Sequence, residues 1–280
     1  MMKTGLARNL IIAALALTVL LAACTKPEQS PSNQSPSQPG GTSTKPSTTI
    51  GVYRPNNSTF YLHTSNMPGN PEIAMSFGPQ EGIPVAGDWD GDGNTTVGIY
   101  KPGEATFYLR NSNSPGNADV TVAFGAKGSV PIVGDWDGNG STTVGVYNSN
   151  ESTFYLRNSN ASGSADVTIV YGVKGDIPLA GDWDGNGSVT IGVYRPADST
   201  FYLRNNNSPG AADITVVYGT KGDVPLAGDW DGNGSVTIGV YRPADSTFYL
   251  RNANASGNAD YYVQFGASND IPIVGHWEKQ

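Results

Sequence analysis

Acidic side chains recur in this chain at a spacing that suits a hard cation. In the segment Asp88-Trp89-Asp90-Gly91-Asp92-Gly93, carboxylates occupy positions 1, 3 and 5, and the glycine at position 6 allows a sharp turn. One backbone curl can direct these oxygens at a calcium ion, and a carbonyl at position 7, Asn94, can add another ligand. Without a cation, two carboxylates about 4 Å apart repel by about 1 kcal/mol in water and about 4 kcal/mol at an effective dielectric of about 20. Calcium would remove this repulsion.

The acidic loop occurs four times. Its expected ligand positions 1, 3, 5, 7 and 9 are Asp88, Asp90, Asp92, Asn94 and Thr96; Asp135, Asp137, Asn139, Ser141 and Thr143; Asp182, Asp184, Asn186, Ser188 and Thr190; and Asp229, Asp231, Asn233, Ser235 and Thr237. Only the first loop has Asp at position 5, so we expect it to bind best, with the weak affinity of extracellular sites, ~10⁻⁴–10⁻³ M. A plain hairpin turn is the alternative, because Asp-Gly-Asn-Gly favours a turn without an ion.

The acidic loops belong to a repeat of 47 residues, with successive copies beginning at Gly87, Gly134, Gly181 and Gly228. A fifth copy is split between the two ends of the repeat region, at residues 48–53 and 275–277. Residues 181–205 and 228–252 are identical at all 25 positions. Identical repeats suit a structural role or repeated display of one site better than catalysis, which needs a single asymmetric constellation.

Each repeat contains four short β-rich runs separated by Gly, Pro or Asn, which in the second period are residues 96–100, 105–110, 119–125 and 130–136. Short strands with a long exact period predict a β-propeller with four-stranded blades. The sequence contains five such sets, which predicts an all-β, five-bladed propeller over residues 48–280. The run at 271–277 would complete the N-terminal blade and close the ring, hiding exposed strand edges. An open solenoid is the competing arrangement.

The loop Asp-x-Asp-x-(Asp/Asn)-Gly, followed by Val-Gly-(Ile/Val)-Tyr, resembles the FG-GAP and VCBS-type repeats of bacterial secreted proteins. Those repeats are similar to the propeller of integrin α chains, and the resemblance covers residues 48–277. It implies a propeller fold with calcium in the acidic loops. Position 9 is acidic in most family loops but Thr in this chain, and family propellers commonly have more than five blades.

The N-terminus predicts export and lipid anchoring. Lys3 and Arg8 precede an apolar run over residues 10–23, which is shorter than the roughly 20 residues of a spanning helix. The following Leu-Ala-Ala-Cys24 resembles a bacterial lipobox, in which the cysteine is acylated. We therefore expect a lipoprotein signal peptide at 1–23 and a disordered tether, rich in Pro, Ser and Gln, at 24–47. An uncleaved anchor helix with an incidental cysteine is the alternative, and both place the repeats outside the cytoplasmic membrane.

The acidic composition limits the partners. A formal net charge of −8 and a pI of about 4.6 should repel phosphate backbones and anionic lipid surfaces. We expect no nucleic acid partner, a monomeric protein, and contact with the membrane only through the N-terminal lipid.

These features favour a non-catalytic, lipid-anchored, extracytoplasmic propeller that binds or displays an extracellular protein or polymer ligand. The first alternative is a lectin-like propeller with up to five equivalent inter-blade sugar sites, which would gain avidity from multivalency. A glycoside hydrolase is a third, less favoured option. Few acids lie outside the repeat pattern, and those that do fall in or beside turns: Glu72, Glu81, Glu104 and Glu151.

Overall fold

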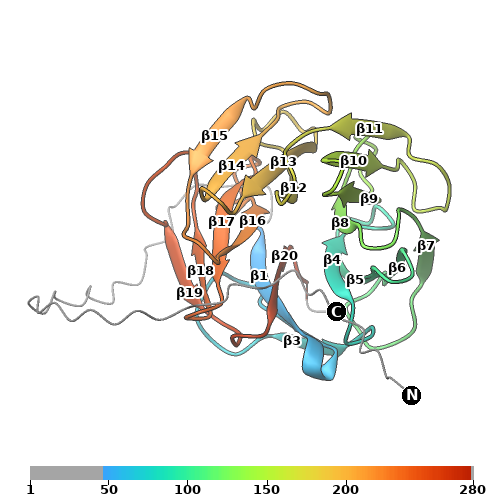
Figure 1. Ribbon diagram of the computed structural model, residues 1–280. Helices are drawn as coiled ribbons and strands as arrows, with labels where there is room; N and C mark the ends of the chain where they lie inside the picture. The colour runs from blue at the N-terminus through green and yellow to red at the C-terminus, as the bar shows by residue number, and fades with distance from the viewer. Residues whose placement is uncertain (1–46, 279–280) are drawn as a thin grey trace, which may run out of the picture. The chain divides into compact units, whose positions relative to one another are not determined.

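The computed structural model describes residues 47–278, which form five separate four-stranded antiparallel sheets. The sheets stand as blades around a central axis (Figure 1). Blade I combines strands from both ends of this region: β20 (Ile271–Gly275), β1 (Thr49–Arg54), β2 (Thr59–Leu62) and β3 (Ile73–Ser76). A short 3-10 helix, η1 (Pro55–Asn57), joins β1 to β2.

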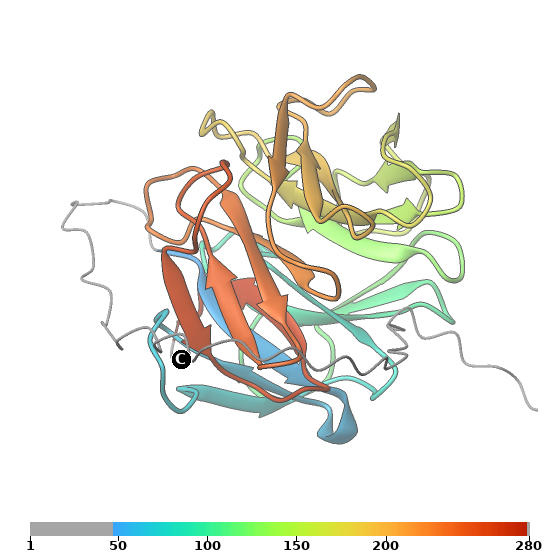
Figure 2. The same ribbon diagram turned by 60° about the vertical axis from the view of Figure 1, so that its left-hand side comes forward.

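The other four blades each use consecutive strands. Blade II contains β4 (Ile83–Gly87), β5 (Thr96–Lys101), β6 (Thr106–Leu109) and β7 (Val120–Ala123). Blade III contains β8 (Val130–Gly134), β9 (Thr143–Asn148), β10 (Thr153–Leu156) and β11 (Val167–Val170). Blade IV contains β12 (Ile177–Gly181), β13 (Thr190–Arg195), β14 (Thr200–Leu203) and β15 (Ile214–Val217). Blade V contains β16 (Val224–Gly228), β17 (Thr237–Arg242), β18 (Thr247–Leu250) and β19 (Tyr261–Gln264), which lie side by side in Figure 2.

The ring is closed. The innermost strands contact one another in the order β4, β8, β12, β16, β20 and back to β4. At the joint, β20 pairs antiparallel with β1 from Thr49 opposite Gly275 to Tyr53 opposite Ile271. The predicted five-bladed propeller, including closure by the C-terminal strand, is therefore confirmed, and the open solenoid is excluded.

The hydrophobic core lies between the blades. In one interface, Leu179, Tyr194 and Phe201 of blade IV pack with Ile238 and Val240 of blade V, and all five side chains are buried. Equivalent clusters fill the other interfaces. Because no blade can bury its apolar faces alone, the repeats must fold against their neighbours.

The glycine of each Val-Gly-x-Tyr or Ile-Gly-x-Tyr strand is required by this close packing. A Cβ atom added at Gly192 would lie 2.8 Å from Leu203 Cδ2 of the paired strand. The same approach recurs in the other blades, so the repeated glycine of the second strand leaves room for the leucine side chain of the third strand.

The predicted signal peptide, the predicted acylation site Cys24 and nearly all of the predicted tether lie outside the described residues. Within residues 47–278, no helix has the length and apolar character needed to cross a membrane.

Candidate functional site

The first acidic loop brings its three carboxylates together. Single oxygens of Asp88, Asp90 and Asp92 lie within 4.8 Å of one another. Burial, followed by the negative charges of Asp92 and Asp88, raises the pKa of Asp90. The clustered carboxylates therefore repel one another, and a cation would relieve this repulsion.

The same carboxylates also organise the loop as a turn. Asp88 Oδ1 accepts a hydrogen bond from Gly91 N at 2.8 Å, and its Oδ2 accepts one from Gly93 N at 2.8 Å. Asp92 Oδ1 accepts one from Asn94 N at 2.8 Å. The loop thus has a preorganised shape, and both the turn and the calcium interpretations are compatible with it.

The other three loops keep Asp at positions 1 and 3 and Asn at position 5. In each, the Asn side-chain oxygen accepts a hydrogen bond from the position-7 N–H at 2.8 Å; the pairs are Asn139 with Ser141, Asn186 with Ser188, and Asn233 with Ser235. The last loop differs in one respect: Asp229 Oδ1 is buried without a hydrogen-bond partner, and burial followed by the charge of Asp231 raises the pKa of Asp229. A buried carboxylate oxygen without a hydrogen-bond partner could be satisfied by coordinating a cation.

The threonines at position 9 form hydrogen bonds to backbone carbonyls of the strands. Thr96 Oγ1 lies 3.2 Å from the carbonyl oxygen of Gly87 and 2.7 Å from that of Arg110, which links β4, β5 and the end of β6. The three other position-9 threonines make the same two contacts: Thr143, Thr190 and Thr237. Their hydroxyl hydrogens are directed at carbonyls of the sheet, so the loop carboxylates are the stronger ligands for a cation.

The acidic loops also join neighbouring blades. Asp88 N donates to Thr142 Oγ1 at 3.0 Å, and Thr142 N donates to Asp88 O at 2.6 Å. The loop of blade V makes the corresponding pair of bonds between Asp229 and Thr48 at the closure of the ring, at 3.0 and 2.7 Å. Stiffening a loop would therefore also strengthen an interface between blades.

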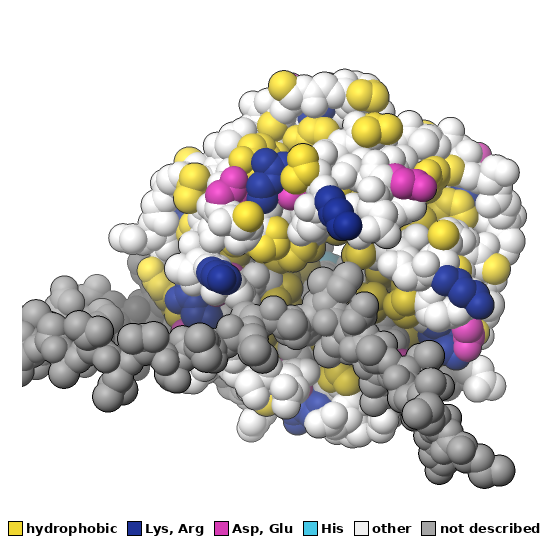
Figure 3. All heavy atoms as spheres, viewed as in Figure 1, with side chains coloured by type: hydrophobic (Ala, Val, Ile, Leu, Met, Phe, Trp, Pro, Cys, Tyr) yellow, Lys and Arg dark blue, Asp and Glu magenta, His cyan; other side chains and the backbone are white. Residues whose placement is uncertain are grey.

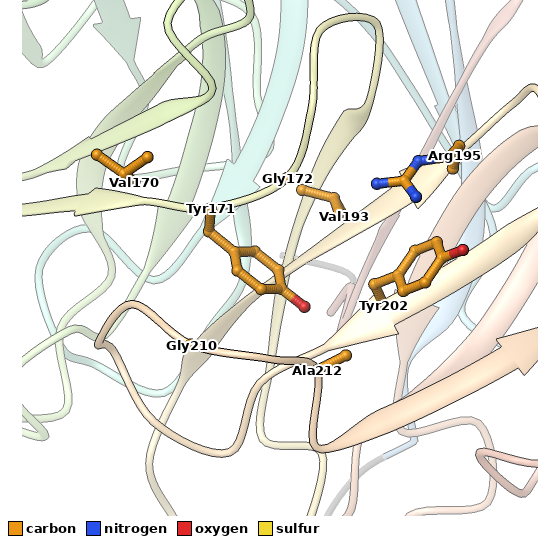
Figure 4. Close-up of a pocket in the computed structure, with 8 residues that line it drawn as sticks. All are labelled: Val170, Tyr171, Gly172, Val193, Arg195, Tyr202, Gly210 and Ala212. Atoms are coloured by element: carbon orange, nitrogen blue, oxygen red, sulfur yellow. The ribbon is translucent and has the colours of Figure 1, made fainter.

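A cavity of about 260 Å³ opens between blades III and IV (Figure 4). Its walls come from the end of the outer strand of blade III and from the face of blade IV: Val170, Tyr171, Gly172, Val193, Arg195, Tyr202, Gly210 and Ala212. Apolar and polar groups contribute almost equally to the surface of this pocket, in which aliphatic and aromatic side chains lie beside the Arg195 guanidinium. Pockets that bind small molecules combine apolar walls with a few placed polar groups.

Tyr171 carries a buried hydroxyl at the wall of this pocket. The side chain is only 8% exposed, and its hydroxyl has no hydrogen-bond partner. Figure 4 shows the ring reaching from blade III toward Ala212 and Tyr202 of blade IV. Burial raises the pKa of Tyr171 to about 12, so the hydroxyl stays protonated and can donate at neutral pH. A buried hydroxyl without a partner destabilises a fold by about 1–3 kcal/mol, which a bound ligand would recover.

Arg195 is held in place by two contacts. Its Nε and Nη2 donate to the buried carboxylate of Asp176, both at 2.9 Å, and its guanidinium lies 4.3 Å from the centre of the Tyr202 ring. The hydrogen bond to Asp176 raises the pKa of Arg195. Tyr202 is fixed in turn, because its hydroxyl donates to Asp198 Oδ2 at 3.1 Å. The Arg195–Asp176 pair has no net charge, so the pocket favours a neutral ligand over an anion.

Sequence reasoning did not identify Tyr171, Arg195 or Asp176 as site residues. The available signal was the variation at fixed positions of the repeat: position 171 is Tyr or Phe in the five copies, and position 195 is Arg, Lys or Asn. The prediction of up to five equivalent inter-blade sites remains a prediction, and the residues at these two positions differ among the five interfaces.

No protein-family model matches the sequence, and comparison with curated proteins gives no match either. Among solved structures, the chain is similar to a lectin from Agrocybe aegerita, described as specifically recognising non-reducing terminal N-acetylglucosamine. The two share 15% sequence identity, the alignment covers 68% of this chain and 56% of the lectin, and the TM-score is 0.42. A likeness of this size carries no argument about a ligand. The molecule's own geometry defines its class, a five-bladed β-propeller built from 47-residue repeats with a pocket between two blades.

Proposed function

We propose that the protein is a non-catalytic, extracytoplasmic binding module whose inter-blade pocket takes one neutral sugar residue of an extracellular glycan or polymer. The observation that supports this proposal is a cavity of mixed polarity walled by Tyr171, Tyr202 and the fixed Arg195, with the buried, unpartnered Tyr171 hydroxyl at its wall. Of the two binding functions expected from the sequence, recognition of a sugar therefore takes precedence over recognition of a protein.

The chemistry of the pocket matches a sugar ring. Sugars combine apolar C–H faces, which pack on aromatic and aliphatic walls, with hydroxyl groups that need donors and acceptors. Tyr171 offers a hydroxyl, and Arg195 offers Nη1, the guanidinium nitrogen outside its pair with Asp176. A volume of about 260 Å³ is below the usual range of about 300–1,000 Å³ for drug-sized ligands, which favours one ring over an oligosaccharide. Charged side chains are scattered over the face seen in Figure 3, without a broad field of one sign.

The proposal excludes glycoside hydrolysis at this pocket. That reaction needs two carboxyl groups flanking the scissile bond, whereas none of the pocket's lining residues is Asp or Glu. Asp176 and Asp198 lie behind the wall and are engaged by Arg195 and Tyr202. Incubation of the full chain with chromogenic glycosides should therefore give no turnover, and turnover abolished by Asp176→Asn would overturn the non-catalytic assignment.

Binding of the full chain to a glycan array tests the proposal directly. We expect signal on glycans that end in, or repeat, a neutral sugar, and competition by the free methyl glycoside of that sugar. Tyr171→Phe should reduce this binding without disturbing the fold, because Phe occupies the same repeat position at three other interfaces: Phe77, Phe124 and Phe265. An array without signal, together with capture of a protein partner through another face, would contradict the proposal.

We also propose that calcium binds the Asp88 loop, with weaker binding in the other three. Asp88, Asp90 and Asp92 would hold the ion, which would neutralise their mutual repulsion and stiffen a loop bonded to the next blade. Direct titration of the full chain with ⁴⁵Ca²⁺ tests this proposal. Loss of the tightest site in Asp88→Asn, with no change in the matched Asp135→Asn variant at that site, would support it, and absence of binding at millimolar calcium would leave these loops as turns.

The proposed location is the bacterial cell envelope, with acylated Cys24 as the membrane anchor. This proposal rests on the sequence before residue 47. Labelling of cells with a fatty-acid analogue should mark the wild-type protein and leave Cys24→Ala unlabelled. Labelling that persists in Cys24→Ala would contradict it.

A further inference from the structure

The interface between blades IV and V repeats every residue type that lines the pocket between blades III and IV. Each of the pocket positions has the same amino acid 47 residues further along the chain. Tyr218 thus takes the place of Tyr171, Arg242 that of Arg195, and Tyr249 that of Tyr202. No other interface keeps this full set.

The contacts repeat together with the residue types. Arg242 Nε and Nη2 donate to Asp223 at 2.9 and 2.8 Å, and the guanidinium lies 4.4 Å from the centre of the Tyr249 ring. Tyr249 in turn donates its hydroxyl to Asp245 Oδ2 at 2.8 Å. Tyr218 is 8% exposed, as Tyr171 is, and burial raises its pKa as well. The second interface therefore presents the same neutral ion pair, stacked arginine and buried tyrosine.

The interfaces of blade II lack these groups. Between blades I and II, Lys101 stands at the arginine position and Gly82 at that of its aspartate partner. Between blades II and III, the two positions hold Asn148 and Ser129. Both interfaces have Phe at the tyrosine position, so neither has the ion pair or the buried hydroxyl.

The interface between blades V and I has only half of the set. Arg54 pairs with Asp270 at 2.8 Å through two hydrogen bonds and lies 4.7 Å from the centre of the Tyr61 ring. Phe265, however, replaces the tyrosine, and the imidazole of His63 packs against its ring at 4.3 Å. The aromatic position is thus occupied by a packing contact and has no hydroxyl to offer.

We infer that the propeller carries two neighbouring sugar sites, one on each side of blade IV, and that it recognises a polymer or branched glycan which presents the same neutral sugar more than once. This inference rests on the proposed function. Blade IV contributes to both sites, since it supplies Arg195 and Tyr202 to one and Tyr218 to the other. Two sites on one rigid body make the second binding event intramolecular, which raises avidity by about 10²–10⁴ when the polymer spans them.

Two features distinguish the two sites, and the first is that the hydroxyl of Tyr171, unlike that of Tyr218, is found buried without a partner. Second, Tyr262 stands where blade IV has Thr215, is 55% exposed, and meets the Tyr249 ring edge-on with ring centres 5.4 Å apart. The site between blades IV and V therefore has an additional aromatic wall and should bind the same sugar more tightly. Tyr262→Thr should remove this additional affinity.

The test counts sites by equilibrium dialysis of the full chain against the radiolabelled methyl glycosides of glucose, galactose, mannose and N-acetylglucosamine. We expect saturation at two molecules of one of these glycosides per chain. Tyr171→Phe and Tyr218→Phe should each lower this number to one, and the double variant should bind none. Tyr100→Phe is the matched control, because it removes the hydroxyl of a buried tyrosine of blade II, away from both proposed sites.

The possible results distinguish failure of the proposed sugar-binding function from failure of the two-site inference alone. If the wild-type chain binds none of the four glycosides, the proposed function itself fails, and the two-site inference fails with it. If it binds one or five molecules, or if the double variant still binds, the proposed sugar-binding function stands and the two-site inference is overturned. On a surface coated with the matching polysaccharide, each single Tyr→Phe variant should bind about 10²-fold more weakly than the wild type.

Discussion

The interfaces flanking blade IV and those flanking blade II have the same kind of buried interior. They differ at the rim, the part of each interface that lies nearer the surface. In each interface a tyrosine and a phenylalanine from one blade pack tightly, as Tyr194 and Phe201 do at 4.8 Å and Tyr100 and Phe107 at 4.5 Å. Nearer the surface, blade IV has Arg195 paired with Asp176, whereas blade II has Lys101 beside Gly82. The ring needs every interior to be filled, but it does not need every rim to be alike. The rim is therefore where one repeat can acquire a function that another lacks.

The largest effect is expected at high pH and should involve every interface. Burial raises the pKa of all five interior tyrosines above 10, that of Tyr100 to about 12; the others are Tyr53, Tyr147, Tyr194 and Tyr241. Their neutral forms stabilise the fold fully below pH 10, and this stability is lost as the pH rises from about 10 toward 12. Circular dichroism should show one cooperative unfolding step in this window, and a native spectrum at pH 12 would contradict equal burial.

Truncation of one interior phenylalanine should destabilise the fold nearly as much, and by the same amount in blade II as in blade IV. Phe107→Ala and Phe201→Ala each remove a fully buried ring and should lower the free energy of unfolding by about 3–5 kcal/mol. Denaturant titration of the two variants provides the comparison. A difference larger than about 2 kcal/mol would show that the interiors are not equivalent.

The rim aspartate should matter only where it has a partner. Asp176→Ala leaves the partly buried Arg195 without its carboxylate and should lower the free energy of unfolding by about 2–3 kcal/mol, because the 26% exposure of the arginine keeps the loss below that of a fully buried pair. Ser129→Ala at the equivalent position beside Asn148 should change it by less than about 1 kcal/mol. Equal effects in the two melts would remove the distinction between the rims.

Calcium should stabilise the protein through the Asp88 loop more than through the others. At 1 mM calcium and a dissociation constant of ~10⁻⁴ M, binding adds about 1.4 kcal/mol to the free energy of unfolding. The melting temperature should rise with calcium, fall with chelator, and respond little in Asp90→Asn. A calcium response that is unchanged in Asp90→Asn would assign the effect to another loop.

The smallest effect on the free energy of unfolding is expected for Tyr171→Phe, which separates a role in binding from a role in folding. Tyr171→Phe removes a buried hydroxyl that has no partner, so it should leave the free energy of unfolding unchanged or raise it by about 1 kcal/mol while sugar binding is lost. Tyr147→Phe is the contrasting change, since the Tyr147 hydroxyl donates to Tyr171 O at 3.3 Å and its loss should lower stability slightly. A clear loss of stability in Tyr171→Phe would make its hydroxyl a structural group.

The architecture could be predicted from the sequence because its determinants are local. The run predicted as a strand at 96–100 is β5, Thr96–Lys101, and the run at 105–110 contains β6, Thr106–Leu109. The split repeat directly encodes the closure of the ring between β1 and β20. Acidic residues two apart on one loop could likewise be expected to meet, as the carboxylates of Asp88 and its neighbours do.

The pocket could not be predicted in the same way. Tyr171 directly follows β11 of one blade and Arg195 ends β13 of the next, so their proximity depends on how two repeats stack rather than on either repeat alone. Tyr171 also looks like the phenylalanines at the same position of other repeats. Its hydroxyl becomes informative only once the structure shows that it is buried and unpartnered at the wall of a cavity.

A crystal structure of the full chain soaked with the methyl glycoside that binds most tightly in dialysis tests the central claim most directly. The account predicts one sugar between blades III and IV, in contact with Tyr171 and Arg195, and a second between blades IV and V, in contact with Tyr218 and Arg242. Sugar bound at the interfaces of blade II, or on a face of the propeller away from Tyr171 and Tyr218, would contradict it.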